Sequence, residues 1–211
     1  MQVSSQTELK IDSDPSTEAS LFLLHGFLDP QTCASLREEA YISPTTKAPV
    51  YMQGSPENVH ENVRKTTSFH PSADTVAAIH DKLSLQKSAL ENHFGLSLTD
   101  CERPQFLLYQ PGDFFVRHQD GNTNQLDFDH LRIRRISLVV FLNDSCEEER
   151  VNTFSGGSLH FYGRDYARAN GPAHFTLKSE TGLLVAFSAD MVHEVSHVTR
   201  GQRFTIISWF R

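Results

Sequence analysis

The spacing of apolar residues predicts helices in the first half of the chain and strands in the second half. Asp29 and Pro30 are suited to begin a helix, as its cap and first turn, and Gln31 to Ala40 continues it. A second helix is predicted from about Ser72 to Phe94, where Gly95 is placed to end it. Its apolar positions approximate a helical stripe: Val76, Ile79, Leu83, Leu90 and Phe94.

Polar segments surround these two helices. Residues 1–20 are predicted to be a loose lead-in, and residues 41–68, rich in Pro, Ser, Thr, Asn and Lys, a long loop. Residues 21–211 are expected to form a single domain, with helical support over about 29–95 and a β core over about 100–211.

From about Asp100 onward the chain is rich in β-branched and aromatic residues and is punctuated by Gly, Pro and Asn-Asp. The predicted strands are Gln105–Gln110, Phe114–Asp120, Ile133–Asn143, Ser158–Tyr162, Ala173–Leu177, Leu183–Ser188, Met191–Val198 and Arg203–Phe210. Strands that follow helices without βαβ alternation predict a mainly β protein, a jelly roll or related closed β-sandwich.

Composition narrows the classes of protein that the chain can be. Hydrophobic residues make up 38% and charged residues 21%, as in soluble globular proteins, and the net charge of −7 argues against a nucleic-acid partner. The short apolar run Leu21 to Leu28 contains His25 and Gly26, so no signal peptide or membrane span is expected. Three scattered cysteines indicate a reducing compartment, and we expect a cytoplasmic protein. The oligomeric state is left open.

His118 and Asp120 are the first candidate metal ligands. On a strand their side chains share one face, because strand side chains alternate. An imidazole beside a carboxylate supplies two thirds of the 2-His-1-carboxylate triad of non-haem iron(II) enzymes. This spacing alone is weak evidence, since the chain has 11 His.

The C-terminal segment adds a third ligand and a cation. His193 is followed by a turn containing Gly201 and then by Arg203, which predicts a hairpin that aims both side chains into one cavity. Thr205 would share the face of Arg203. A cation close to a metal site needs an anion between them, and the planar guanidinium suits a carboxylate.

The spacing of His118, Asp120, His193 and Arg203 resembles that of the 2-oxoglutarate/iron(II) dioxygenases, in particular the prolyl 4-hydroxylase-like branch. Four further local motifs agree: Tyr109-x-Pro-Gly-x-Phe, Phe141-Leu142-Asn143, Gly156-Gly157-x-Leu159 and Gly201-x-Arg203. The resemblance covers about residues 21–211 and is strongest over 105–210.

The resemblance implies a double-stranded β-helix (jelly roll, cupin-like) and iron(II) bound by His118, Asp120 and His193. It implies that Arg203, assisted by Thr205, binds the far carboxylate of 2-oxoglutarate. Tyr109 would contact this cosubstrate, although a core or rim aromatic is the other interpretation. Many members carry Tyr at the position of Phe141, so that hydroxyl must be replaced here.

The implied reaction consumes 2-oxoglutarate and O₂, releases succinate and CO₂, and hydroxylates an unactivated C–H bond, with ascorbate as activator. Asp120, where halogenases of the superfamily have Ala or Gly, favours hydroxylation. We expect a prolyl residue of a polypeptide as substrate, clamped by the polar segments 41–68 and Gly121 to His130. The alternatives are a free amino acid or other small-molecule substrate, and a non-catalytic iron or 2-oxoglutarate sensor.

His193 to His197 also satisfies H-E-x-x-H, the zinc protease motif, which requires a helix. The flanking Val192, Val195 and Val198 predict a strand instead, on which His193 and His197 would lie about 13 Å apart, too far to bind one ion. Other polar residues are interpreted without a catalytic role. They are His160, His174 and His197 as hydrogen-bonding residues, Arg132, Arg134 and Arg135 as a solvated strand face, and Asp127 and Asp129 as loop residues.

Overall fold

The computed structural model describes residues 20–52, 55–58, 60–121, 133–164, 171, 173 and 175–211, with side chains described outside residues 50–58. Several residues singled out in the sequence lie outside this part of the chain. They are residues 1–19 of the expected lead-in, most of the segment that begins at Gly121, and Asp127, Asp129, Arg132 and His174.

The first helix begins where the sequence predicts. Helix α2 (Pro30–Ile42) is capped by Asp29, whose carboxylate accepts hydrogen bonds from the backbone N–H of Thr32, at 2.9 Å, and from its hydroxyl, at 2.7 Å. In the described residues no helix is long and apolar enough to cross a membrane.

The second predicted helix is two helices, α3 (Ala73–Ser84) and α4 (Lys87–Phe94). At the junction Gln86 N–H bonds Leu83 O, three residues back, so the α-helical hydrogen-bond ladder is interrupted there. Gly95 ends α4 in the left-handed conformation, with φ 66°, as predicted.

The prediction of a long loop over residues 41–68 is wrong. The segment contains five short strands: β2 (Thr45–Lys47), β3 (Val50–Met52), β4 (Ser55–Asn58), β5 (Arg64–Lys65) and β6 (Thr67–Phe69). Its polar composition hid them because β2 and β5 are edge strands and β3 and β4 form a separate hairpin.

Two antiparallel sheets make up the β core. The larger has the order β1-β13-β9-β16-β7-β6-β2 and the smaller β12-β11-β14-β8-β5. Besides β2 and β6, the larger sheet contains β1 (Leu21–Leu24), β7 (Gln105–Tyr109), β9 (Ile136–Phe141), β13 (Leu184–Ser188) and β16 (Arg203–Phe210). Besides β5, the smaller sheet contains β8 (Phe114–His118), β11 (Leu159–Phe161), β12 (Phe175–Leu177) and β14 (His193–Val195).

The strands predicted after Asp100 are confirmed with two exceptions. The predicted strand Phe114–Asp120 ends at His118, as β8. The predicted strand Met191–Val198 divides into β14 and β15 (Val198–Arg200), and β15 pairs with β10 (Ser155–Gly156) in a small separate sheet. Strand β1 was missed by the sequence analysis; it pairs with β13 at the edge of the larger sheet.

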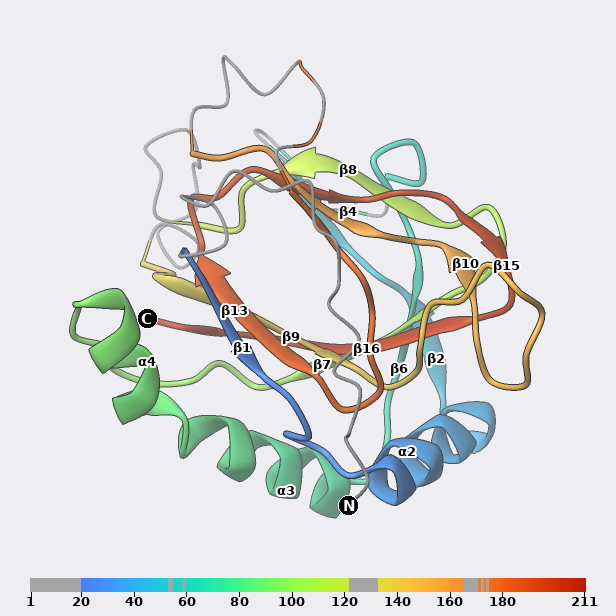
Figure 1. The fold of residues 1–211 in the computed structure, drawn as a ribbon, viewed down its shortest axis with the longest axis horizontal. Helices are drawn as coiled ribbons and strands as arrows, with labels where there is room; N and C mark the ends of the chain where they lie inside the picture. Colours follow the sequence, from blue (N-terminus) through green and yellow to red (C-terminus); the bar gives the residue numbers. More distant parts are fainter. Residues whose placement is uncertain are drawn as a thin grey trace, which may run out of the picture.

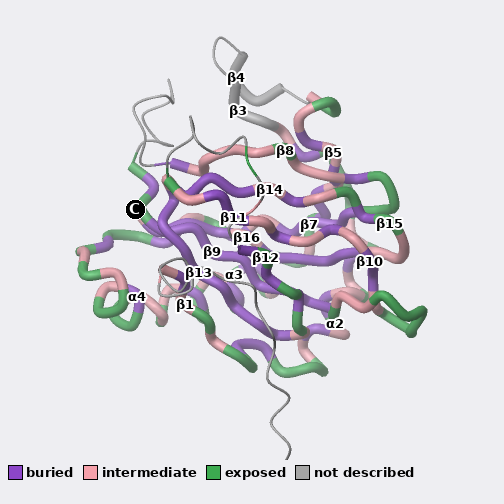
Figure 2. Tube along the Cα trace, turned by 45° about the horizontal axis from the view of Figure 1, so that its top comes forward, coloured by how far each residue is buried: buried purple, intermediate pink, exposed green. Residues whose placement is uncertain are grey.

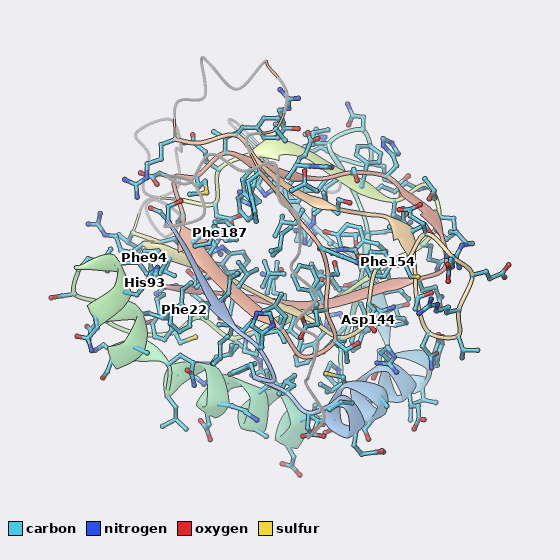
Figure 3. The ribbon with its side chains drawn as sticks, in the orientation of Figure 1. Phe22, His93, Phe94, Asp144, Phe154 and Phe187 are labelled. Atoms are coloured by element: carbon cyan, nitrogen blue, oxygen red, sulfur yellow. The ribbon has the colours of Figure 1, made fainter. Side chains whose placement is uncertain are left out.

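The molecule is layered, with the three helices on one face of the larger sheet and the smaller sheet on the other (Figure 1). One apolar cluster fills the helix–sheet interface, and a second, which includes Tyr109, Phe141, Phe161 and Phe187, lies between the sheets. Buried stretches concentrate in the strands of both sheets (Figure 2). At one edge Phe22 of β1 meets His93 of α4, with ring centroids 5.4 Å apart (Figure 3).

Candidate metal centre

Three side chains with metal-ligand chemistry meet at the end of the smaller sheet. His118 ends β8 and His193 begins β14, directly opposite each other in the strand register. The Nε2 atoms of His118 and His193 lie 3.5 Å and 3.6 Å from the two carboxylate oxygens of Asp120. One ligand atom from each residue lies within 4.8 Å of the others, and this trio is the cluster with metal-site spacing in the described chain.

Backbone carbonyls fix which nitrogen each histidine presents to the centre. The Nδ1 atom of His118 lies 2.8 Å from Val116 O, and that of His193 lies 2.8 Å from Met191 O. Because a carbonyl only accepts, each Nδ1 carries the proton and each Nε2 lone pair faces Asp120. The two imidazoles are thereby preset as neutral metal ligands.

Asp120 is held by the loop that follows β8, not by the strand as predicted. Strand β8 ends at His118, and the backbone N–H groups of Asp120 and Gly121 both donate to Ala189 O, at 2.9 and 3.0 Å. The hydroxyl of Ser137, on β9 of the opposite sheet, donates to Asp120 Oδ2 at 2.7 Å. Both sheets therefore position this carboxylate.

The electrostatics suit a cation at this point. Burial alone would raise the pKa of the Asp120 carboxyl, but the neighbouring His193 and His118 bring it well below its ordinary value. Burial, together with the neighbouring His118, lowers the pKa of His193 to about 4. A carboxylate and neutral imidazoles at neutral pH form the donor set that Fe(II) accepts.

Arg203 is the second buried feature, at the start of β16. Its side chain is 2% exposed, and its guanidinium carbon lies 5.0 Å from the ring centre of Tyr109 and 5.4 Å from that of Phe141. It donates to the Thr205 hydroxyl at 3.3 Å, while its Nε has no hydrogen-bond partner. No carboxylate of the described residues pairs with it. Burial lowers its pKa to about 10, so it stays charged at neutral pH.

The predicted hairpin between His193 and Arg203 is wrong, but both side chains still contact the same apolar cluster. Strands β14 and β16 belong to opposite sheets, and β15 lies between them in the chain. The His193 ring packs against Phe187, with ring centroids 4.8 Å apart, and Phe187 lies in the apolar cluster between the sheets (Figure 3). Arg203 contacts the same cluster through Tyr109 and Phe141.

Comparison with known proteins identifies this arrangement. Residues 104–211, just over half of the chain and including all three metal-ligand candidates and Arg203, match the model of the 2OG-Fe(II) oxygenase superfamily. The chain belongs to that superfamily. It is a 2-oxoglutarate-dependent dioxygenase, and the family implies Fe(II) as its cofactor and 2-oxoglutarate and O₂ as its cosubstrates.

The relatives of this oxygenase are prolyl hydroxylase-like, in agreement with the branch that the motifs indicated. A PKHD-type hydroxylase of Sphingopyxis alaskensis is 24% identical over 164 residues, which cover 76% of this chain and 67% of the relative. A Pseudomonas putida prolyl-4-hydroxylase superposes with a TM-score of 0.65 at 24% identity, covering 91% of this chain and 92% of the other.

A prolyl hydroxylase from Trichoplax adhaerens, solved in complex with a peptide fragment of hypoxia inducible factor, has a TM-score of 0.63. It is 17% identical, and the match covers 92% of this chain and 84% of that one. These likenesses confirm the jelly-roll fold.

The competing zinc protease motif of this oxygenase is not on a helix. His193 lies in β14 and His197 just before β15, where its ring stacks on Phe114 with centroids 4.4 Å apart, and His197 is absent from the metal-ligand cluster. His160 bonds the Thr176 hydroxyl at 2.7 Å, as expected of a hydrogen-bonding histidine.

The prediction that Arg134 belongs to a solvated strand face is wrong. Arg134 is 6% exposed, donates to both carboxylate oxygens of Glu102 at 2.9 and 2.7 Å, and lies over the Trp209 ring. Ser137 and Ala189, which hold Asp120, were missed because a buried hydroxyl and a backbone carbonyl leave no motif in the sequence.

Proposed function

We propose that this oxygenase hydroxylates a prolyl residue of a polypeptide, using Fe(II) held by His118, Asp120 and His193. The far carboxylate of 2-oxoglutarate would bind Arg203, assisted by Thr205, with Tyr109 alongside. The observation that carries the proposal is that a buried guanidinium without a carboxylate partner in the described residues and the set of three metal-ligand candidates adjoin the same apolar cluster. Ascorbate is proposed as the activator.

Charge balance supports the binding of 2-oxoglutarate between the iron site and Arg203. Iron(II), two neutral imidazoles and one carboxylate carry a net charge of +1, and Arg203 adds another, so the cosubstrate dianion is neutralised by the two together. Bound iron supplies the activation of O₂, one atom of which enters succinate and the other the substrate hydroxyl. The protein's own residues bind and orient: Arg203 fixes the far end of the cosubstrate, and the apolar cluster excludes water.

The substitution of Phe141 for Tyr removes one hydroxyl from the surroundings of Arg203. Thr205 stands directly across from Phe141 in the strand register, is fully buried, and already accepts a hydrogen bond from Arg203. We propose that its hydroxyl takes over the second contact with the cosubstrate carboxylate.

The proposal of a polypeptide substrate rests on the relatives of this oxygenase. It is favoured by the Trichoplax protein, which was solved with a peptide, and by the prolyl hydroxylase-like relatives. Residues 41–68, expected to be a polar loop beside the site, form strands, and residues 122–130 lie outside the described chain. We propose that the β3–β4 hairpin, in place of a loop, contributes one wall for the peptide.

The first experiment tests the reaction separately from the substrate. Anaerobic addition of Fe(II) and 2-oxoglutarate should give the weak visible charge-transfer band of this chemistry. His118→Ala, Asp120→Ala and His193→Ala should each lose both the band and turnover, since each removes one of three protein ligands. Absence of iron binding in the native protein would favour the non-catalytic alternative.

The second experiment tests the substrate. The enzyme is incubated with Fe(II), ascorbate and 2-oxoglutarate, and either with proline-containing peptides or with free amino acids. Mass spectrometry should show one added oxygen on a peptidyl proline. Oxygen added only to free amino acids would refute the peptide proposal and leave the reaction class intact.

A further inference from the structure

A cavity of about 280 Å³ lies behind the strand that carries Arg203. It is bounded by the C-terminal half of α2, by residues 149–153 and by the turn between β15 and β16, which lie on the same side of the molecule (Figure 1). Gln202 and Phe204 line it. Because strand side chains alternate, Arg203 between them points to the opposite face, toward the metal centre.

The lining of this cavity is rich in arginine, although the chain as a whole carries a net charge of −7. Arg150 is neutralised by Glu148, at 2.5 Å. Arg37 and Arg200 form no ion pair with any carboxylate of the described residues. With Glu149 as the carboxylate in the lining, the cavity keeps an excess of positive charge.

Arg37 and Arg200 are each held through a single guanidinium nitrogen. Arg37 donates through Nη1 to Leu142 O. Arg200 donates through Nη2 to the carbonyls of Cys146 and Glu148 and to the Ser155 hydroxyl, at 2.8 to 2.9 Å. Within the described chain their remaining guanidinium nitrogens have no protein acceptor. Two guanidinium groups held at fixed places, with donors to spare, can bind the oxygens of one anion.

The floor of the cavity is rigid. The Asn143 side chain, 2% exposed, donates to Asn152 O at 3.0 Å and Gln202 O at 2.8 Å, and accepts from Phe204 N–H at 3.0 Å. Asn152 has φ 61°, the one positive value at a non-glycine residue in the described chain. A Cβ on Gly201 would lie 2.3 Å from Thr153 O, so the turn fits only with glycine. The hydrogen bonds of Asn143 and the left-handed turn at Asn152 therefore fix the backbone that lines the cavity.

We propose that this cavity is a binding site for a small oxyanion, a phosphate or a carboxylate, held by Arg37 and Arg200 apart from the metal centre. Its volume lies just below the range of ordinary small-molecule sites, about 300 to 1,000 Å³, and therefore fits a compact ligand. Occupancy is coupled to the cosubstrate, because Gln202 and Phe204 in the cavity wall flank Arg203. The binding site is independent of the proposed function, whereas the coupling rests on it.

Calorimetric titration of the metal-free protein in chloride buffer, once with inorganic phosphate and once with citrate, tests the site. Saturable binding of at least one probe is expected, and the tighter probe distinguishes phosphate from carboxylate chemistry. Arg37→Gln should weaken it at least tenfold. The control Arg103→Gln removes an exposed arginine elsewhere and should leave binding unchanged. Arg200→Gln is the less decisive variant, because Arg200 also holds the loop around Cys146 and Glu148.

A second control separates this cavity from the cosubstrate site. In Arg203→Gln, binding of the probe should persist. If binding were lost there and kept in Arg37→Gln, the anion would occupy the cosubstrate site, and the proposal would be overturned, as it would by no saturable binding to the native protein.

Coupling is measured by anaerobic titration of 2-oxoglutarate onto the iron-loaded enzyme with and without the saturating probe. A several-fold change in 2-oxoglutarate affinity in the native enzyme, absent in Arg37→Gln, is expected. Equal affinities would remove the coupling. A failure of 2-oxoglutarate to bind at all would refute the proposed function and leave the result for the metal-free protein standing.

Discussion

Arg134 and Arg203 are both buried, at 6% and 2% exposure, and both lie against aromatic rings at the two ends of β16. At the end of the strand, Arg134 lies over Trp209 and makes a two-point ion pair with Glu102. At the start of the strand, Arg203 has no carboxylate within the described residues, and its Nε is unpartnered.

The difference separates a structural charge from a functional one. Burying a charge costs several kcal/mol unless a partner compensates it, and only Arg134 has its partner in the protein itself. Arg203 therefore reduces the stability of the empty protein and becomes compensated when an anion arrives. On this view Arg134, which packs against the end of the strand, completes the fold, whereas Arg203, at the start of the strand, is the arginine proposed to bind the cosubstrate.

Removal of each arginine in turn should have opposite effects on stability. Among the described residues, Arg134→Met leaves the Glu102 carboxylate, which is 11% exposed, with Arg211 at 3.2 Å as its remaining ion-pair partner, so the free energy of unfolding should fall by about 3 kcal/mol. Arg203→Met removes an uncompensated charge and should leave the stability unchanged or higher. Urea unfolding without metal or cosubstrate measures both. An equal loss in the two variants would contradict the comparison.

For the affinity for 2-oxoglutarate, in contrast to stability, the substitution of Arg203 should have a large effect and that of Arg134 none. In Arg203→Met the affinity for 2-oxoglutarate should fall about 30-fold, or about 2 kcal/mol, because the cosubstrate carboxylate loses its charged partner. Iron affinity should change little. The anaerobic charge-transfer band, titrated with 2-oxoglutarate, gives the affinity, and Arg134→Met is the control that should bind normally. An unchanged affinity in Arg203→Met would remove Arg203 from the site.

Two buried serines extend the comparison to the metal. Ser137 donates to Asp120 Oδ2 at 2.7 Å, whereas Ser208 donates to Glu102 O at 2.6 Å. Loss of a hydroxyl that orients a metal ligand typically weakens metal affinity by 10-fold or more, so Ser137→Ala should bind Fe(II) about 10-fold more weakly. Ser208→Ala should lower the free energy of unfolding by about 1 kcal/mol and leave the iron affinity unchanged. Ser137→Thr, which keeps the hydroxyl, should restore the affinity.

The sequence predicted the parts of this site that depend on local spacing. His118, Asp120 and His193 come together as the family motifs indicated, although Asp120 lies in the loop after β8 and not on the strand. Thr205 shares the face of Arg203 because strand side chains alternate. Sequence reasoning failed where long-range packing decides. It placed Arg134 in solvent, joined β14 to β16 in a hairpin and treated residues 41–68 as a loop, since partners such as Glu102, β10 and β7 lie far along the chain. No local sequence pattern predicts such distant partners.

The smallest expected effect concerns His197, the second histidine of H-E-x-x-H. Its ring stacks on Phe114 with centroids 4.4 Å apart and lies outside the metal-ligand cluster, so His197→Ala removes a packing contact and no ligand. Iron affinity should therefore match that of the native enzyme within about twofold, the scatter of substitutions away from a site. His193→Ala, four residues earlier, should abolish iron binding. Equal losses in the two variants would mean that both histidines bind one ion, which requires a helix where the structure has β14 and β15. The metal centre, Arg203 and the contrast with Arg134 would then all have to be reconsidered.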